Sequence, residues 1–106
     1  MKKGTIVLIP FPFTDLKGNK NRPAVVLFST ELDVTVCFIT SDLKWETEYD
    51  ITLTPTEFNG LKTKSLIRVG KIATIDTELI LGELGKLTGI QIKELNNCLT
   101  VLLQLE

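Results

Sequence analysis

The sequence predicts a mainly β protein that ends in one α-helix. Short runs of β-branched and apolar residues, bounded by turn residues, fill the first three quarters of the chain, at residues 5–9, 24–28, 34–40, 49–53, 65–69 and 71–75. From Ile90 onward apolar residues instead recur three and four positions apart, which is the period of a helix. With 106 residues the chain has room for one domain, which we place at residues 1–106.

The expected strands differ in their pattern. Residues 49–53 alternate between apolar and polar, as a strand with one buried face does, whereas residues 24–28 (Ala-Val-Val-Leu-Phe) are apolar throughout. We therefore expect the segment 24–28 to be central in the sheet. The first segment follows Lys2 and Lys3 and faintly resembles a signal peptide. Prolines at positions 10 and 12 interrupt it and no small-residue cleavage site follows, so a first strand is favoured.

The C-terminal segment predicts an amphipathic helix that covers the sheet. Thr88 and Gln91 have the spacing of a capping box, and an apolar stripe follows at Ile92, Leu95, Leu99 and Leu102. A second apolar set widens this stripe: Cys98, Val101, Leu103 and Leu105. Core packing and contact with another chain are both open for this second set.

A twelve-residue connection at positions 10–21 separates the first two expected strands. Its second half is polar and rich in turn residues, and loops of this length in small domains are usually functional or mobile. Gly18 and Asn19 permit a positive φ at the tip. A hairpin extension on the surface is the alternative.

Composition excludes several classes of protein. The chain has no histidine, so Ser-His-Asp and histidine-pair chemistry are excluded, and we expect neither a metal site nor a cofactor. Cys37 and Cys98 lie in apolar surroundings without a CxxC pattern, which favours buried free thiols over a disulfide. No apolar run approaches the roughly 20 residues of a membrane-spanning helix, so we expect no membrane partner. Because no secretory signal is recognised, the cytoplasm is the expected compartment.

Charge is distributed unevenly along the chain although the net charge is only −1. Two segments, residues 1–22 and 61–75, hold nine of the twelve lysine and arginine residues. Most acids between them lie at residues 42–57. A folded molecule with one basic and one acidic side is therefore expected, with ordinary solvated loops as the alternative.

Three residues stand out as candidates for binding a phosphate. Arg22 ends a basic loop directly before a strand, and its guanidinium offers parallel donors to phosphate oxygens. A structural salt bridge is the alternative role for Arg22. Thr40 and Ser41 end the third expected strand, where their hydroxyls can donate to a phosphate or cap a turn.

Taken together and in order, these motifs resemble the MazF/PemK toxins. The opening half resembles the family at residues 4–15 (Gly-Thr-Ile-Val-Leu-Ile-Pro-Phe-Pro-Phe-Thr-Asp), 21–27 (Asn-Arg-Pro-Ala-Val-Val-Leu) and 39–41 (Ile-Thr-Ser). The second half matches the family's later strands at residues 65–68, 71–76 and 84–87. Each motif is weak alone, but the series covers nearly the whole chain.

The resemblance implies an SH3-like small β-barrel of the MazF/PemK/CcdB type with a C-terminal α-helix, assembled as a homodimer. It further implies a type II toxin that cuts single-stranded RNA or mRNA without a metal, and that inhibits translation and growth. The expected products are a 2′,3′-cyclic phosphate or 3′-phosphate and a 5′-hydroxyl end. A MazE-like antitoxin, bringing an acidic segment studded with apolar residues, is the expected protein partner.

Site residues carry over from the family by position. Arg22 and Thr40 are the expected catalytic residues, one stabilising the phosphorane-like transition state and the other holding the scissile phosphate. The expected RNA-binding or supporting residues are Phe13, Thr14, Asp15, Lys17, Lys20, Ser41 and Arg68. Phe11, Phe13 and Trp45 are candidates for stacking on bases.

The sequence also departs from the PemK branch. That branch places an aspartate two residues after the arginine that Arg68 matches, but here the position is Gly70, and the histidine of its first loop is missing. The general base therefore stays open between Asp15 and Asp76, although aspartate at position 76 suits a turn or a helix start better. Two alternatives follow: a noncatalytic toxin that poisons a protein such as DNA gyrase, and an inactive module that binds RNA.

Overall fold

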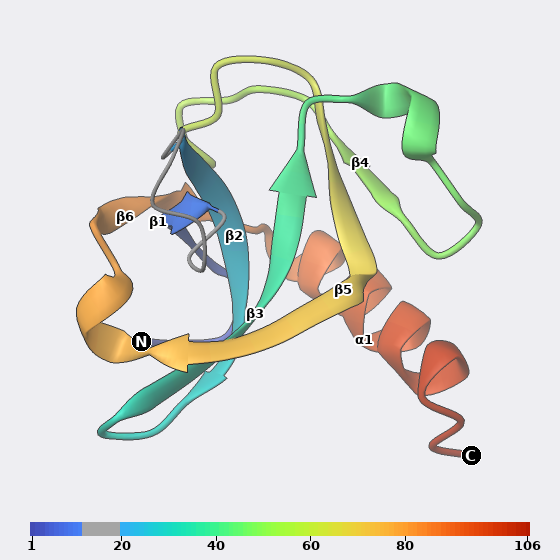
Figure 1. Ribbon diagram of the computed structural model, residues 1–106. Coiled ribbons are helices and arrows are strands. Elements are labelled where there is room, and N and C mark those ends of the chain that lie inside the picture. Colours follow the sequence, from blue (N-terminus) through green and yellow to red (C-terminus); the bar gives the residue numbers. More distant parts are fainter. Residues whose placement is uncertain (12–19) are drawn as a thin grey trace.

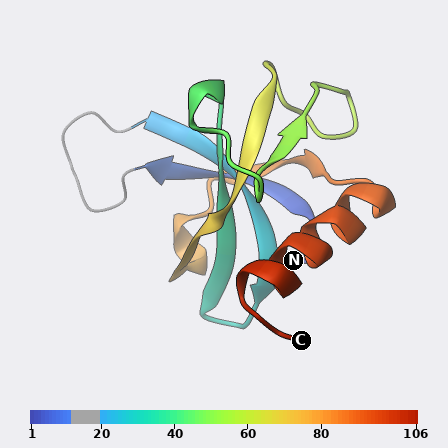
Figure 2. The ribbon, with the colours of Figure 1, turned by 90° about the vertical axis from the view of Figure 1, so that its right-hand side faces the viewer.

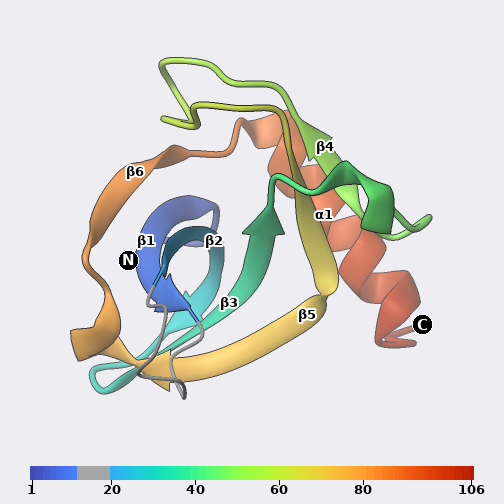
Figure 3. The same ribbon diagram turned by 45° about the horizontal axis from the view of Figure 1, so that its top comes forward.

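The computed structural model describes residues 1–11 and 20–106, which form a curled antiparallel sheet with one C-terminal helix (Figure 1). The six strands are ordered β4-β5-β3-β2-β1-β6, and the sheet curls into a half-barrel (Figure 3). The elements in chain order are β1 (Thr5–Phe11), β2 (Lys20–Ser29), β3 (Asp33–Thr40), the 3₁₀ turn η1 (Leu43–Trp45), β4 (Ile51–Leu53), β5 (Ser65–Asp76), the 3₁₀ turn η2 (Thr77–Leu79), β6 (Gly82–Lys86) and α1 (Gly89–Leu102). The expectation of a mainly β fold with a C-terminal helix is confirmed.

Strand β2 is central, as its continuous apolar run predicts. It pairs with β1 on one side, where Ile6 faces Val25, and with β3 on the other, where Ala24 faces Phe38. Its residues Ala24, Val25 and Val26 are fully buried. Because successive side chains point to opposite faces, burial of all three requires cover on both faces of the sheet.

Two hydrophobic cores supply that cover. The first lies between the sheet and α1, which packs along one face (Figure 2), and it includes Ile6, Val25, Ile67, Leu95 and Leu99. The second lies on the opposite face, inside the curl of the sheet, and is built from Val7, Ile9, Ala24, Val26, Val34, Val36 and Ile75. Burial of these side chains is the main favourable contribution to folding, at about 1.5–3 kcal/mol for a large aliphatic residue.

Strand β5 carries the irregularity that bends the sheet. Cys37 of β3 pairs with Ile72 and the next residue, Phe38, pairs with Arg68, so residues 69–71 of β5 have no counterpart on β3. The bend lies midway along β5 (Figure 3). The two apolar runs expected at 65–69 and 71–75 are thus one strand, bent where Gly70 interrupts the apolar pattern.

Helix α1 begins at the predicted capping box. The hydroxyl of Thr88 accepts a hydrogen bond from the Gln91 amide at 3.2 Å, and the Gln91 side chain accepts one from the Thr88 amide at 2.9 Å. Leu95 and Leu99 are buried, and Ile92, Cys98 and Leu102 pack against the same core. Val101, Leu103 and Leu105 are more than half exposed, so the second apolar set is divided between core and surface.

The remaining differences from expectation have local causes. Strand β4 is shorter than the expected 49–53, because the Asp50 amide bonds the Thr47 carbonyl in a turn before Ile51. Strand β6 has the sequence Gly-Glu-Leu-Gly-Lys, which has little β propensity, and only the family resemblance pointed to residues 84–87. Within the described part of the chain, no helix is long and apolar enough to cross a membrane.

Both cysteines are free thiols, as expected. Cys37 is fully buried, and its thiol donates to the Val69 carbonyl at 3.6 Å. Burial raises the pKa of Cys37 from 9.0 to about 12. Cys98 is partly buried beside the first core, and burial also raises its pKa. Neither thiol is a reactive thiolate at neutral pH.

Candidate nucleic-acid interface

A cleft of about 630 Å³ opens where β2 begins, β3 ends and β5 bends. We call it the cationic cleft. Its lining comprises Arg22, Phe38, Ile39, Thr40, Ser41, Asp42, Arg68 and Lys71. Four residues singled out in the sequence, Arg22, Thr40, Ser41 and Arg68, therefore meet in one cleft although they are up to 46 positions apart.

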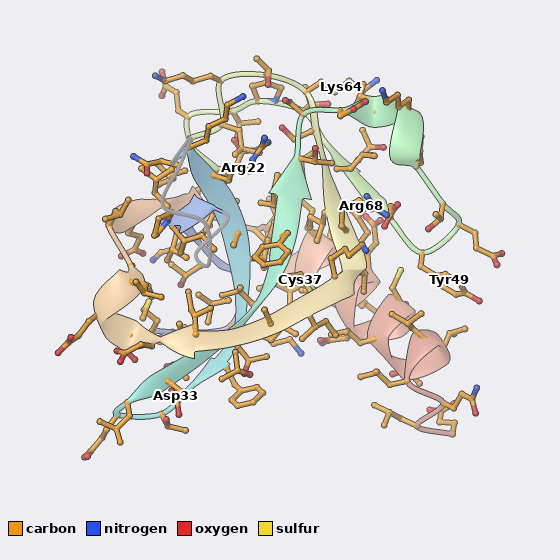
Figure 4. The ribbon with its side chains drawn as sticks, viewed as in Figure 1. Arg22, Asp33, Cys37, Tyr49, Lys64 and Arg68 are labelled. Carbon is orange, nitrogen blue, oxygen red and sulfur yellow. The ribbon has the colours of Figure 1, made fainter. Side chains whose placement is uncertain are left out.

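Strand register brings Arg22 and Thr40 together. Ala24 pairs with Phe38, and continuing this antiparallel register by two residues sets Arg22 opposite Thr40. Residues two apart on a strand point to the same face, so Arg22 and Thr40 share the face of Ala24 and Phe38. That face is the inner face of the curl. Both side chains are half-buried at its end, near the position of Arg22 in Figure 4.

The end of β3 presents hydroxyl groups in a defined geometry. The Thr40 hydroxyl oxygen accepts a hydrogen bond from the Asp42 amide at 3.1 Å, which fixes the side chain and directs its own proton elsewhere. Ser41 is exposed beside it. Asp42 then caps η1, since its carboxylate accepts from the Lys44 amide at 3.3 Å. The turn at residues 40–44 thus holds one hydroxyl of the cleft in place.

Arg68 enters the cleft from β5 and is held by Asp50. The Arg68 Nε atom lies 3.3 Å from Asp50 Oδ2, and the two side chains are 22% and 3% exposed. Within the described part of the chain this Nε has no hydrogen-bond partner, so its contact with Asp50 is an ion pair. The same carboxylate oxygen accepts from the Thr47 amide at 2.9 Å. A turn before β4 therefore positions a cation of the cleft (Figure 4).

The expectation of separate acidic and basic sides is wrong at these positions. Asp42 lines the cationic cleft and Asp50 is buried against Arg68, so two members of the acidic segment lie at the basic site. Sequence separation concealed this arrangement, because a turn between β3 and β4 returns the acidic segment to the side of β5. Lys71 is a further cleft residue that was not among the expected site residues, although it belongs to the basic segment 61–75.

Other expected site residues lie elsewhere or outside the described residues. Phe13, Thr14, Asp15 and Lys17 lie outside them, as do the side chains of Phe11 and Trp45. Lys20 is exposed at the start of β2, opposite Phe11 of β1, and is not among the described residues that line the cleft.

Asp76 caps a turn, as the sequence favoured, and is distant from the cleft. Its carboxylate accepts from the Glu78 amide at 2.9 Å at the start of η2. It pairs with Asp33, whereas Thr40 pairs with Leu66 at the other end of the same ladder. Asp76 therefore lies at the opposite end of the ladder from Thr40 and is not among the described residues that line the cleft. Within residues 1–11 and 20–106, no group of three or more Cys, Asp or Glu side chains is placed to hold a metal ion.

The fold and the cleft define a small curled β protein whose inner face ends in three cations and two hydroxyls, a set of donors suited to a phosphate chain. The chain belongs to the PemK-like, MazF-like toxins of type II toxin–antitoxin systems, whose family model matches residues 2–103.

Solved structures share this fold at low sequence identity. The toxin MazF-mt6 of Mycobacterium tuberculosis superposes with a TM-score of 0.79 at 20% identity, covering 96% of this chain and 98% of that one. The MazE-MazF structure of Deinococcus radiodurans gives 0.79 at 19% identity, covering 100% and 97%. A mycobacterial endoribonuclease in complex with its cognate antitoxin gives 0.76 at 16% identity, covering 100% and 97%. A comparison with curated proteins finds no match.

Proposed function

We propose that this toxin is a metal-independent endoribonuclease that cleaves single-stranded RNA, including mRNA. The observation that carries the proposal is that Arg22 and Thr40 line one cleft together with Arg68 and Lys71. The family supports it, as does the description of a mycobacterial protein of the same fold as an endoribonuclease. Single-stranded RNA is the expected substrate because sequence-selective proteins read unstacked bases.

The proposed reaction needs little from the protein beyond alignment and charge. The 2′-oxygen of the substrate forms a bond to phosphorus while the bond from phosphorus to the 5′-oxygen breaks. One proton leaves the 2′-hydroxyl and one reaches the 5′-oxygen. The products are a 2′,3′-cyclic phosphate, which water opens to a 3′-phosphate, and a 5′-hydroxyl end. Arg22 stabilises the charge that develops on the phosphate oxygens, and the Thr40 hydroxyl donates a hydrogen bond to one of them.

The proton acceptor is sought among carboxylates, because the chain has no histidine. Asp76 is at the wrong end of the sheet. Asp42 is the carboxylate among the described residues that lines the cleft. We therefore add Asp42→Asn to the test as the candidate base, alongside Asp15→Asn from the first loop.

The test incubates purified toxin with a long single-stranded RNA and with its DNA equivalent, in excess chelator, and maps the cut ends. We expect cutting of RNA alone, with 5′-hydroxyl ends. Arg22→Gln should abolish cutting, while Lys93→Gln, which removes an equal charge from the exposed face of α1, should leave it unchanged. Binding of RNA without cutting would contradict the proposal and favour the inactive module that Gly70 suggests. A toxin that neither binds nor cuts RNA would favour a poison of a protein target.

Thr40 gives a second test with a conservative control. Thr40→Val keeps the shape of the side chain but removes the hydroxyl, so we expect kcat to fall about 10²-fold or more, as loss of one transition-state donor typically does. Thr40→Ser keeps the hydroxyl and should stay within tenfold of wild type. Equal rates for the two variants would show that the hydroxyl does not act on the phosphate.

We further propose a homodimer controlled by a MazE-like antitoxin in the cytoplasm. The Deinococcus structure is described as MazE-MazF, and the mycobacterial one as a complex with a cognate antitoxin. For this chain, the cations of the cleft suit an acidic antitoxin segment that orders on binding. The measurement is inhibition of RNA cutting by a synthetic acidic, apolar-studded peptide. Tight inhibition by a purely basic peptide would count against the assignment.

A further inference from the structure

A second cavity, of about 360 Å³, is also lined by Arg22. It shares Arg22, Ile39 and Ser41 with the cationic cleft, so the two hollows adjoin at these residues. Its lining also includes the loop at residues 60–63, Ser65 at the start of β5 and Leu84 of β6. We call it the flanking pocket. Its size falls within the roughly 300–1,000 Å³ that ligand pockets occupy.

The outer wall of the flanking pocket is preorganised by a buried asparagine. Asn59 is 2% exposed, and its side-chain oxygen accepts from the amides of Thr56 and Leu61, both at 3.0 Å. Its side-chain nitrogen donates to the Thr54 carbonyl at 2.8 Å. These bonds fix the backbone that leads into residues 60–63. A wall that is already ordered loses little conformational entropy when a ligand binds.

Two glycines bring this wall against β6. Gly60 has a φ of +70°, and a Cβ there would lie 2.0 Å from the Leu84 carbonyl oxygen. A Cβ on Gly85 would lie 2.4 Å from the Phe58 carbonyl oxygen. The Lys86 amide also donates to Phe58 at 3.0 Å. Close backbone packing therefore sets the position of Lys62 and Thr63 relative to Arg22.

The lining joins an apolar floor to two cations, Arg22 and Lys62. Leu8, Pro23 and Leu84 offer apolar surface, while Lys62 and Thr63 are exposed at the rim. A nucleotide has the same division, with a flat base and a charged phosphate. Since Arg22 borders both hollows, a chain with its scissile phosphate at Arg22 has its next nucleotide beside this pocket. A peptide with a free carboxylate would also pair with the cationic side chains, but it would cover less of the apolar floor.

We propose that the flanking pocket binds the nucleotide next to the scissile phosphate of a single-stranded RNA, its base on the apolar floor and its outer phosphate at Lys62. This inference rests on the proposed function. If it is correct, the affinity of the toxin for RNA depends on one particular nucleotide beside the cut. The contact of Lys62 with the outer phosphate of that nucleotide then supplies part of the affinity.

The experiment measures binding to RNAs that carry a 2′-deoxy group at the cut nucleotide and so are not cleaved. The RNAs are shortened one nucleotide at a time from either end, and each dissociation constant is taken from fluorescence anisotropy. For wild type we expect that removing the nucleotide directly beside the cut raises the dissociation constant about tenfold. We call this tenfold change the truncation step. Lys62→Gln should remove that step, and its salt slope on the full RNA should fall by about 0.7, the loss of one phosphate contact on a single strand.

Matched variants separate this result from general loss of charge or fold. Lys64→Gln removes the same charge from a residue at the same end of the sheet (Figure 4), and Lys64 is not among the described residues lining either hollow. It should keep the truncation step. Thr63→Phe, an exposed position on the rim, should remove the step by filling the pocket. Circular dichroism melting of each variant confirms that it is folded.

The outcomes distinguish the inference from the proposed function. If the toxin cuts RNA but Lys62→Gln keeps the step, or Lys64→Gln removes it equally, the inference is overturned and the function stands. If wild type neither binds nor cuts RNA, both fall. Weaker binding of an acidic antitoxin peptide to Lys62→Gln, with RNA affinity unchanged, would assign the pocket to the antitoxin and overturn the RNA proposal.

Discussion

At the scale of single residues, the ion pair between Asp50 and Arg68 holds a cation of the cleft in place. Asp50 is almost fully buried, so removing its charge leaves the partly buried guanidinium of Arg68 without an anion. We expect Asp50→Asn to lower the free energy of unfolding by about 3 kcal/mol, the usual cost of breaking a buried pair. Urea denaturation measures the change.

The pair between Asp42 and Lys44 is a control for that prediction. Its side chains are 45% and 70% exposed, so Asp42→Asn should cost less than about 1 kcal/mol.

In the double variant Asp50→Asn/Arg68→Met the loss should be smaller than the sum of the two single losses, because neither charge is then left buried without a partner. An unchanged free energy of unfolding in Asp50→Asn would mean that the pair contributes nothing to stability.

Cys37 makes stability depend on pH in the alkaline range. Burial raises its pKa from 9.0 to about 12, so between these values the folded chain binds a proton that the unfolded chain has lost. The contribution of Cys37 to the free energy of unfolding should therefore be constant below about pH 9 and fall as pH rises toward 12, by at most about 1.4 kcal/mol per unit. Denaturant titrations at pH 8, 9, 10 and 11 measure this fall. Cys37→Ala should flatten the added slope, and an unchanged slope would refute the assignment.

At the scale of elements, the packing of the segment 56–61 on β6 requires glycine at one position and not at another. A Cβ on Gly85 meets the backbone of Phe58 and Asn59 at 2.4–2.6 Å, whereas one on Gly82, on the same strand, meets no described residue within 4 Å. Gly85→Ala should therefore lower the free energy of unfolding by about 2 kcal/mol or more, as overpacking does. Gly82→Ala should change it by no more than about 0.5 kcal/mol.

Thermal or urea unfolding of the two alanine variants checks this prediction. The substitutions are chemically identical and lie three residues apart, so strand propensity affects both. Equal stabilities would show that the segment 56–61 moves freely away from β6. The segment 56–61 would then be unable to form the fixed wall of the flanking pocket.

At the scale of the whole molecule, the end of α1 leaves apolar surface that the described chain does not cover. Val101 and Leu105 are 62% and 66% exposed beyond the buried Leu95 and Leu99. We expect this surface to contribute to the homodimer, so light scattering should give about twice 11.8 kDa. Val101→Lys should shift the mass toward the monomer, while Ile90→Lys, which changes an exposed residue at the other end of α1, should not. A monomeric wild type would contradict the prediction.

The sequence by itself determined the class of the fold and the ends of its best-marked elements. The apolar run at Ala24–Val26 can only be buried on both faces, which makes β2 central, and Thr88 with Gln91 fixes the start of α1 through local hydrogen bonds. Asp76 is equally local, since its carboxylate caps the turn that follows it. Family resemblance added the order of the later strands and pointed to Arg22 and Thr40.

Only the tertiary structure decided which residues meet. The pairing of Ala24 with Phe38 brings Arg22 beside Thr40, and the bulge in β5 brings Arg68 and Lys71 to the same cleft. The turn before β4 places Asp50 against Arg68, and two glycine contacts build the wall beside Arg22. Register, bulges and close backbone approach depend on partners far apart in the chain, so local propensity and periodicity do not encode them.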